Sequence, residues 1–183
     1  MIHRLLASGF LILSLFSCTQ DIANEDIIRS KGLYKSASTG KPLHGSYKSV
    51  TPIGGTYAGD HVSEREFKSG VPVGKWRYIF NGDAISHGEY LENETLKKKI
   101  EKLTSAQRVD FNLWTEGDNK WMLYINLMAP EKEDSNSLHQ IADSIKELNT
   151  GKKQITSFEI FAYSDTTTRS IYRVHQREDV VAH

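Results

Sequence analysis

Apolar and polar residues alternate through the second half of the chain, and this period of two is typical of strands with one buried face. The apolar positions are Val109, Phe111 and Leu113 in a first run and Trp121, Leu123, Ile125 and Leu127 in a second. Residues 116–119, with the sequence EGDN, separate the two runs and favour a turn. We therefore expect a β-hairpin within residues 108–128.

A helical stripe and two further alternating runs follow this hairpin. Leu138, Ile141, Ile145 and Leu148 recur at helical spacing, and Ser135 or Ser137 can cap the N-terminus of the helix. Residues 155–163 and 167–174 then alternate again. The predicted order over residues 108–176 is ββαββ, with one helix packed on a four-stranded sheet and a tail at residues 177–183.

Residues 93–107, which join the two halves of the chain, predict an amphipathic helix or a linker. Their apolar positions are Leu96, Ile100 and Leu103, and charged residues occupy most of the others. The lysines at 97–99 form a short basic run flanked by Glu94 and Glu101. This flanking favours a solvated helix face over a basic binding patch.

The first half of the chain repeats a short motif, a glycine followed two residues later by an aromatic ring or a histidine. The ring positions are Tyr34, Tyr47, His61, Trp76 and Tyr90, and successive glycines lie roughly 13 to 15 residues apart. Turn-forming residues separate the units, and Asn81-Gly82 favours a type I′ hairpin turn. We therefore expect an antiparallel β-meander in this half, and a mainly β, α+β protein overall.

Within this repeat, the stretch GVPVGKWRYIFNGDAISHGEY (residues 70–90) resembles the MORN-variant repeat. The matching positions are Gly70, Gly74, Trp76, Tyr78, Phe80, Asn81, Gly82, Gly88 and Tyr90. The resemblance implies an array of β-hairpins across residues 32–92 that serves binding or scaffolding, and some members of the family are described as antitoxin-like. Its motif residues are structural, so the resemblance implies no catalytic residue.

Five rings of the repeat region are candidate binding residues, namely Tyr47, Tyr57, Trp76, Tyr78 and Tyr90. An exposed strip of such rings on one face would contact a protein or a glycan. The alternative is that the rings pack in the core or against neighbouring hairpins. Their exposure to solvent distinguishes the two arrangements.

The first eighteen residues resemble the signal peptide of a bacterial lipoprotein. Arg4 precedes an apolar run, residues 5–17, that is shorter than the roughly 20 residues needed to span a bilayer. The run ends in Leu15-Phe16-Ser17-Cys18, which resembles a lipobox, and Cys18 is the only cysteine of the chain. The resemblance implies removal of residues 1–17, attachment of lipid, palmitate included, to Cys18 and stable anchoring in a membrane.

Residues 18–31 are expected to be a tether between the lipid and the fold. Thr19 stands where many lipoproteins retained at the inner membrane have an aspartate. The resemblance therefore implies an outer-membrane lipoprotein that faces either the periplasm or the cell surface. Asp21, Glu25 and Asp26 make the tether acidic, as both a surface-export signal and an ordinary solvated linker would allow.

Charge and motif content favour binding over catalysis. The chain carries 23 Lys and Arg against 23 Asp and Glu, so no net field favours a nucleic-acid partner. Common phosphate-binding, metalloprotease and serine-hydrolase motifs are absent from the sequence. We expect no cofactor and no metal, because His44, His61 and His87 lack close ligand spacing. The expected function is that of a non-enzymatic, lipid-anchored envelope protein with a protein or glycan partner.

Two other functions remain open from the sequence. The MORN-variant resemblance allows an immunity or antitoxin-like protein that binds a toxin. An envelope hydrolase would use Asp60 and His61, with Glu64 or Glu66 nearby, as an acid–base pair.

Overall fold

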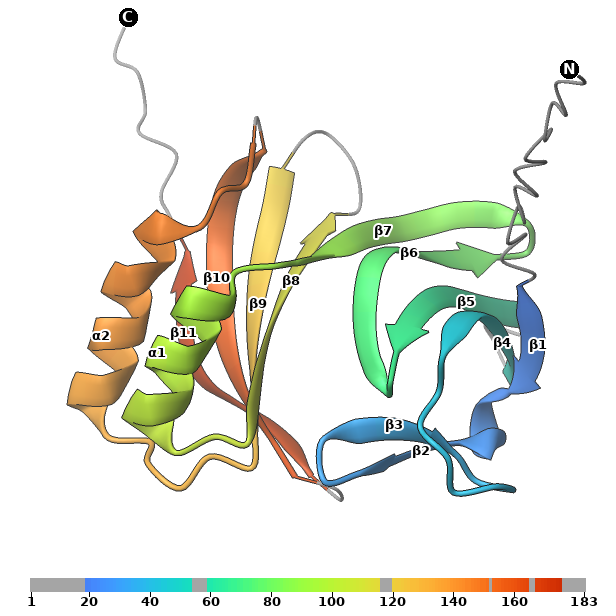
Figure 1. The fold of residues 1–183 in the computed structure, drawn as a ribbon. Helices are drawn as coiled ribbons and strands as arrows, with labels where there is room; N and C mark the ends of the chain where they lie inside the picture. Colours follow the sequence, from blue (N-terminus) through green and yellow to red (C-terminus); the bar gives the residue numbers. More distant parts are fainter. Residues whose placement is uncertain (1–18, 54–58, 116–119, 152, 165–166, 176–183) are drawn as a thin grey trace, which may run out of the picture.

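The computed structural model describes residues 19–53, 59–115, 120–151, 153–164 and 167–175 (Figure 1). Several features expected from the sequence lie outside these ranges: the signal peptide with the lipidated Cys18, the candidate ring Tyr57, the turn at residues 116–119 and the tail at residues 177–183. In chain order the described elements are β1 (Gln20–Ala23), the 3-10 turn η1 (Asn24–Asp26), β2 (Ile27–Ser30), β3 (Leu33–Ser36), β4 (Gly45–Ile53), β5 (Gly59–Lys68), β6 (Val71–Phe80), β7 (Asp83–Leu91), α1 (Glu94–Thr104), β8 (Arg108–Thr115), β9 (Lys120–Met128), α2 (Ser135–Ser144), the 3-10 turn η2 (Ile145–Glu147), β10 (Gln154–Tyr163) and β11 (Thr168–His175).

Nine of the strands form one mixed sheet in the order β1-β4-β5-β6-β7-β8-β9-β10-β11. The pairs β1–β4 and β9–β10 are parallel, and all other neighbours in this sheet are antiparallel. The strands β2 and β3 form a separate antiparallel hairpin. The protein is therefore mainly β and α+β overall, with the predicted antiparallel meander from β4 to β7.

The two halves of the chain share this sheet, because β7 pairs with β8 from His87 opposite Thr115 to Leu91 opposite Phe111. Figure 1 shows the sheet bending at β7, with β8–β11 on one side, β4–β6 on the other and the β2–β3 hairpin below β4–β6. The helices α1 and α2 cover β8–β11 on the face away from that hairpin. We call the face on the hairpin's side the inner face of the sheet.

The hydrophobic core lies between the two helices and β8–β11. The alternating residues expected to share one face are buried there: Val109, Phe111, Leu113, Trp121, Leu123, Ile125, Leu127, Phe158 and Ile160. The helices contribute Leu96, Ile100, Leu138, Ile141 and Ile145 to the same core. The period of two and the helical spacing therefore predicted these core-facing side chains, whereas Leu103 and Leu148, expected on the same stripes, are only partly buried.

Two-residue turns with positive φ connect β5 to β6 and β6 to β7. At the Asn81-Gly82 turn between β6 and β7, φ is 50° and 91°, which confirms the expected hairpin. Ser69-Gly70 joins β5 to β6 with φ of 52° and 81°. Such turns match the right-handed twist of the strands and fix their register.

The segment expected to be a tether contains regular structure from Gln20 onward. The strand β1 pairs with the edge strand β4, with Gln20 opposite Tyr47 and Ala23 opposite Val50. Residues 27–30 form β2. The sequence did not predict this pairing, because acidic residues are interspersed with the apolar ones. A strand in this segment also depends on a free sheet edge with which it can pair.

Residues 93–107 contain a true helix, and this helix makes the second half differ from the expected single-helix layout. Both α1 and α2 pack on the sheet and contact each other. Lys97, expected on a solvated face, is 9% exposed and bonds Glu92 and Glu94. Burial opposes its charge, but the hydrogen bond and charge of Glu92 and the charge of Glu94 raise the pKa of Lys97.

The caps of the two helices are acidic or amide side chains. Asn93 caps α1 and accepts a hydrogen bond from the Leu96 amide. Asp134, rather than the expected Ser135 or Ser137, caps α2 and accepts from the Ser137 amide at 2.9 Å. The hydrogen bonds from Ser137 hold the pKa of Asp134 below its usual value. The prediction was wrong because Ser135 and Ser137 lie inside α2, whereas the capping residue is the one directly before the first residue of the helix.

Candidate functional site

The repeated rings gather on the inner face of the sheet. Tyr47 lies opposite Arg65, Trp76 lies opposite Gly88, and Tyr90 lies opposite Asn112. Residues directly opposite each other point to the same side of a sheet, so all three rings share that face. Tyr34 joins them from the β2–β3 hairpin, since its ring packs against Phe67 on β5 with centroids 5.3 Å apart.

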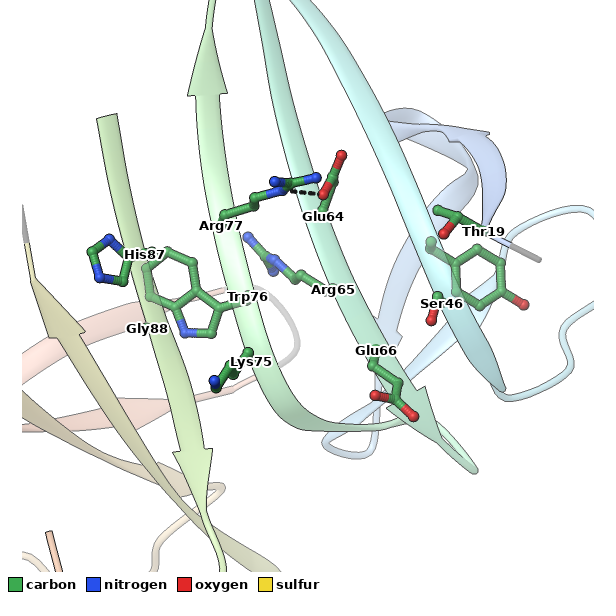
Figure 2. Close-up of a pocket in the computed structure, with 11 residues that line it drawn as sticks. Thr19, Ser46, Glu64, Arg65, Glu66, Lys75, Trp76, Arg77, His87 and Gly88 are labelled. Atoms are coloured by element: carbon green, nitrogen blue, oxygen red, sulfur yellow. Dashed lines mark hydrogen bonds and ion pairs between the residues drawn. The ribbon is translucent and has the colours of Figure 1, made fainter. Parts of the chain in front are cut away.

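The glycine and the ring of neighbouring repeats face each other reciprocally. Gly74 lies opposite Tyr90, and Trp76 lies opposite Gly88. A Cβ atom at Gly88 would collide with the Leu113 carbonyl oxygen and lie 2.7 Å from two atoms of the Trp76 ring. Figure 2 shows this ring beside Gly88 on β7. Glycine at position 88 therefore leaves room for the ring of the neighbouring strand, whereas glycine at position 74 is favoured by its φ of 63°.

A cavity of about 260 Å³ opens on the inner face beside these rings. Strands β3 and β5 to β10 all contribute to its wall, so both halves of the chain build it. Its lining residues are Tyr34, Arg65, Pro72, Trp76, Tyr90, Asp110, Asn112, Tyr124, Asn126, Met128 and Tyr163. We call it the inner cavity.

One side of the inner cavity carries a buried ion pair. Asp110 is 4% exposed, and both its oxygens accept from the Nε atom of Arg108, while Nη2 adds a contact of 2.7 Å. Burial raises the pKa of the Asp110 carboxyl, although the charge and hydrogen bonds of Arg108 act to lower it. Arg108 also donates to the carbonyl of Gly32, which ties the β2–β3 hairpin to the sheet.

Two amide side chains complete this polar wall in different ways. Asn112 accepts a hydrogen bond of 2.7 Å from the indole nitrogen of Trp76. Asn126 is only 9% exposed, yet its amide has no hydrogen-bond partner among the described residues. Among the described residues, the Asn126 amide is not one of the fully buried groups without a partner, so its atoms reach the cavity's solvent and are open to a ligand that both donates and accepts hydrogen bonds.

Two phenols of the cavity, those of Tyr90 and Tyr163, are neutral hydrogen-bonding groups. Burial raises the pKa of Tyr163 to about 12, and burial also raises the pKa of Tyr90. The positive charge of Arg65 acts in the opposite direction on both phenols, so its guanidinium lies close to them. The guanidinium carbon of Arg29 lies 4.7 Å from the centre of the Tyr163 ring.

Arg65 is the charged group that the fold leaves unpaired at this site. Within the described residues it makes no ion pair or side-chain hydrogen bond, although it is half-buried. In Figure 2 the dashed line joins its neighbour Glu64 to Arg77 instead. A half-buried guanidinium without a carboxylate favours an anionic ligand, because it presents a planar fork of donors.

The other predicted aromatic residues have separate surroundings. Tyr47 contacts Phe67 edge-on at 5.9 Å and lines a smaller cavity of about 130 Å³ that shares Tyr34 and Arg65 with the inner cavity. Tyr78 shares a hydrogen bond with the Nδ1 atom of His61. Of the described candidate rings, only Trp76 and Tyr90 therefore line the inner cavity.

The proposed acid–base pair is split between the two faces of β5. His61 lies opposite Phe80 on the inner face, and its Nε2 atom is buried without a partner. Asp60 is exposed, and Glu64 is bonded to Arg77. Since neighbouring residues of a strand point to opposite faces, Asp60 and Glu64 point away from His61.

A larger cavity of about 360 Å³ is drawn in Figure 2, between β4, β5, β6 and β7. Its charged side chains are of both signs: Glu66, Lys75 and Arg77 are exposed, while the half-buried Glu64 and Arg65 also line it, Arg65 being shared with the inner cavity. Exposed groups are already hydrated and gain little from a ligand. The inner cavity is therefore the better candidate site despite its smaller volume.

The three histidines considered for a metal lie apart. His44 accepts from the Ser69 amide, His61 bonds Tyr78, and His87 packs edge-on against Trp121. Across the ranges that the structure describes, no group of three or more His, Cys, Asp or Glu is arranged to hold a metal ion. In the same ranges, none of the helices has the length and apolar character needed to cross a membrane.

Most of the inner cavity's polar lining was not predicted from the sequence. Asp110, Asn112 and Asn126 occupy the polar positions of the alternating strands, which ordinarily face solvent. Nothing in the alternation distinguishes a solvent-facing position from one that faces a cavity. The residue type was the available signal for a cavity. Asn112 and Asn126 are uncharged amides on adjacent strands, at positions where a solvent-facing strand more often carries Lys or Glu.

Comparisons of the chain with models of protein families, with curated proteins and with solved structures gave no match. Only the geometry and chemistry of the site therefore point to a function.

Proposed function

We propose that this chain is a lipid-anchored envelope protein that binds a partner, without catalysis, through the inner face of its sheet. The observation that carries the proposal is the inner cavity, where Trp76 and Tyr90 meet the unpaired Arg65 and Asn126. Aromatic walls with a few converging polar groups are the usual composition of a ligand site.

The MORN-variant resemblance of residues 32–92 fits this role. The antiparallel pairs β4–β5, β5–β6 and β6–β7 form successive hairpins, and the facing of Gly74 with Tyr90 and of Gly88 with Trp76 gives the motif glycines a structural reason. In this proposal the repeat builds the aromatic wall, and the ββαββ unit that follows supplies the polar wall.

The anchoring part of the proposal rests on the lipobox at residues 15–18. The first described strand, β1, begins at Gln20, two residues after Cys18 in the sequence. A lipid on Cys18 would hold the β1 edge of the sheet close to the bilayer. The outer membrane is the proposed location, with the fold in the periplasm or on the cell surface.

A photo-crosslinking residue tests the binding face. The full-length chain would carry the crosslinker at position 34, on the rim of the inner cavity, or at position 85, where Ile85 is 45% exposed. We expect protein or glycan adducts from envelope fractions at position 34 and none at position 85. Equal adducts at both positions, or none at position 34, would contradict the proposal.

Metabolic labelling with a palmitate analogue tests the anchor. Cys18→Ala should abolish labelling and release the protein from the membrane fraction. Ser17→Ala keeps a small residue before the cysteine and should be labelled like the natural chain. Continued labelling of Cys18→Ala would overturn the lipobox assignment.

A further inference from the structure

The inner cavity combines polar and aromatic side chains, and this composition limits its ligand. Asp110, Asn112 and Asn126 face the cavity from β8 and β9. Trp76 and Tyr90 face it from β6 and β7. An entirely apolar ring would leave the Asn126 amide unsatisfied, so the ligand must carry its own donors and acceptors.

Hydroxyl groups fit this requirement better than other neutral groups. One hydroxyl can donate to the Asn126 oxygen, and a neighbouring hydroxyl can accept from its nitrogen. The phenols of Tyr90 and Tyr163, which burial keeps protonated, donate and accept in the same way. A ring with several hydroxyls also has C–H faces that pack on aromatic side chains.

Size and charge narrow the ligand further. The volume of about 260 Å³ lies just under the range of about 300–1,000 Å³ typical of drug-sized ligands, so the cavity suits one ring. The half-buried Arg65 has no counterion among the described residues, while Asp110 already has Arg108. An anionic group on the ligand would satisfy Arg65 without competing for Arg108.

We propose that the inner cavity binds a single hydroxylated ring that bears a carboxylate, an acidic sugar, with Arg65 holding the carboxylate and Asn126 the hydroxyls. This inference rests on the proposed binding function of the same face and specifies its ligand. The acidic sugar is either free or the end of a polysaccharide, because the same ring chemistry serves both.

Calorimetric titration of the full-length chain with D-glucuronate, D-glucose and acetate tests the chemistry. We expect glucuronate to bind at least about tenfold more tightly than glucose. A hydrogen bond to a charged group contributes more free energy than a tenfold change in affinity requires. Acetate, which lacks the ring, should not bind measurably. Equal binding of glucose and glucuronate, or binding of acetate as strong as that of glucuronate, would overturn the inference.

Variants of the two ligand-facing side chains assign their roles. Arg65→Gln should reduce glucuronate binding to the level of glucose and leave glucose binding unchanged. Arg77→Gln, which removes an exposed guanidinium from the neighbouring strand, is the matched control and should change neither affinity. Asn126→Leu should weaken both sugars about equally. An Arg65→Gln variant that still prefers glucuronate would overturn the inference, even if Asn126→Leu fails to fold.

A linear trigalacturonate separates the two sources of the ligand. Affinity close to that of D-galacturonate, the matching monosaccharide, indicates recognition of one ring, and a large gain indicates that further rings occupy the neighbouring cavity at Tyr34 and Arg65. Both results support the acidic-sugar inference, whereas failure of every uronate to bind overturns it. Adducts at position 34 without any uronate binding would refute the ligand class and leave the proposed function standing. Absence of both would refute the two together.

Discussion

At the scale of single residues, glycines and buried charges decide the shape of the inner face. Gly88 has no room for a side chain, because the Trp76 ring and the Leu113 carbonyl already occupy that space. Asp110 keeps its carboxylate in the protein interior because Arg108 surrounds both oxygens. At both positions a single contact determines which residue type the fold accepts.

Gly88→Ala is expected to destabilise the fold by about 3 kcal/mol or more, because the new Cβ must displace the β7–β8 backbone or the Trp76 ring. The midpoint of urea unfolding measures this effect. Ile85→Ala changes an exposed residue of the same strand and should shift the midpoint only slightly. Similar midpoints for the two variants would show that the sheet accommodates a methyl group at residue 88.

Arg108→Gln is expected to cost about 3–5 kcal/mol near neutral pH, because it leaves the Asp110 carboxylate buried without a countercharge. A raised pKa in the folded state means that the Asp110 contribution is complete below its ordinary value of 3.8 and is lost as pH rises through the raised value. Removing Arg108 raises that pKa further. The variant should therefore regain stability between about pH 7 and about pH 5, relative to the natural chain.

Unfolding measured at both pH values checks this prediction, and Arg108→Gln with Asp110→Asn is the control. The double variant carries no buried carboxylate, so its stability relative to the natural chain should depend much less on pH. A single variant that loses stability on acidification would contradict the assigned role of the ion pair.

At the scale of elements, α1 is the segment whose nature the sequence left open. Its start is defined by Asn93, whose side chain accepts from the Leu96 amide at 3.0 Å. Its buried stripe is Leu96 and Ile100, and Lys97 seals the first turn by bonding Glu92 and Glu94. Packing against β8 and α2 turns an ambiguous amphipathic segment into a fixed helix.

Asn93→Ala is expected to lower the free energy of unfolding by about 1 kcal/mol, because an amide at the first turn of α1 loses its acceptor. Thermal or urea unfolding provides the measurement. Asn93→Ser restores a side-chain oxygen at the cap and should recover most of the loss. If alanine and serine are equally destabilising, the cap is not the source of the effect.

At the scale of the whole molecule, one continuous sheet joins the repeat region to the ββαββ unit. The β7–β8 pairing provides the direct link. The β2–β3 hairpin provides a second link, because Arg29 bonds the Ser164 carbonyl and Arg108 bonds the Gly32 carbonyl. The inner cavity depends on both links, because its lining residues come from the repeat region and from the ββαββ unit.

We expect the chain to unfold in a single cooperative transition. Far-ultraviolet circular dichroism, which reports all strands and helices, should coincide with the fluorescence of Trp76, Trp114 and Trp121 in a urea titration. Variants in β4–β6 and in α1 should shift the same transition. Two separate transitions would show that the two halves fold as independent domains.

The sequence by itself determined the meander from β4 to β7, the strands β8 to β11, the helix α2 and most of the side chains that enter the main core, but not β1, β2 or the helical state of α1. The alternation in β8 and β9, the stripe of α2 and the Asn81-Gly82 turn depend on local periods and local backbone preferences, so they are legible without the fold. The repeat of glycine and ring was legible for the same reason.

Only the tertiary structure decided where the remaining polar and aromatic residues meet. The strand register pairs Trp76 with Gly88 and Tyr90 with Asn112. The bend of the sheet places Arg65 and Asn126 on the wall of the same cavity. No local sequence pattern encodes either arrangement. The pairing of β1 with β4 is equally non-local. A polar residue on a strand has the same sequence pattern whether it faces solvent or an enclosed cavity, because burial is set by what packs above it.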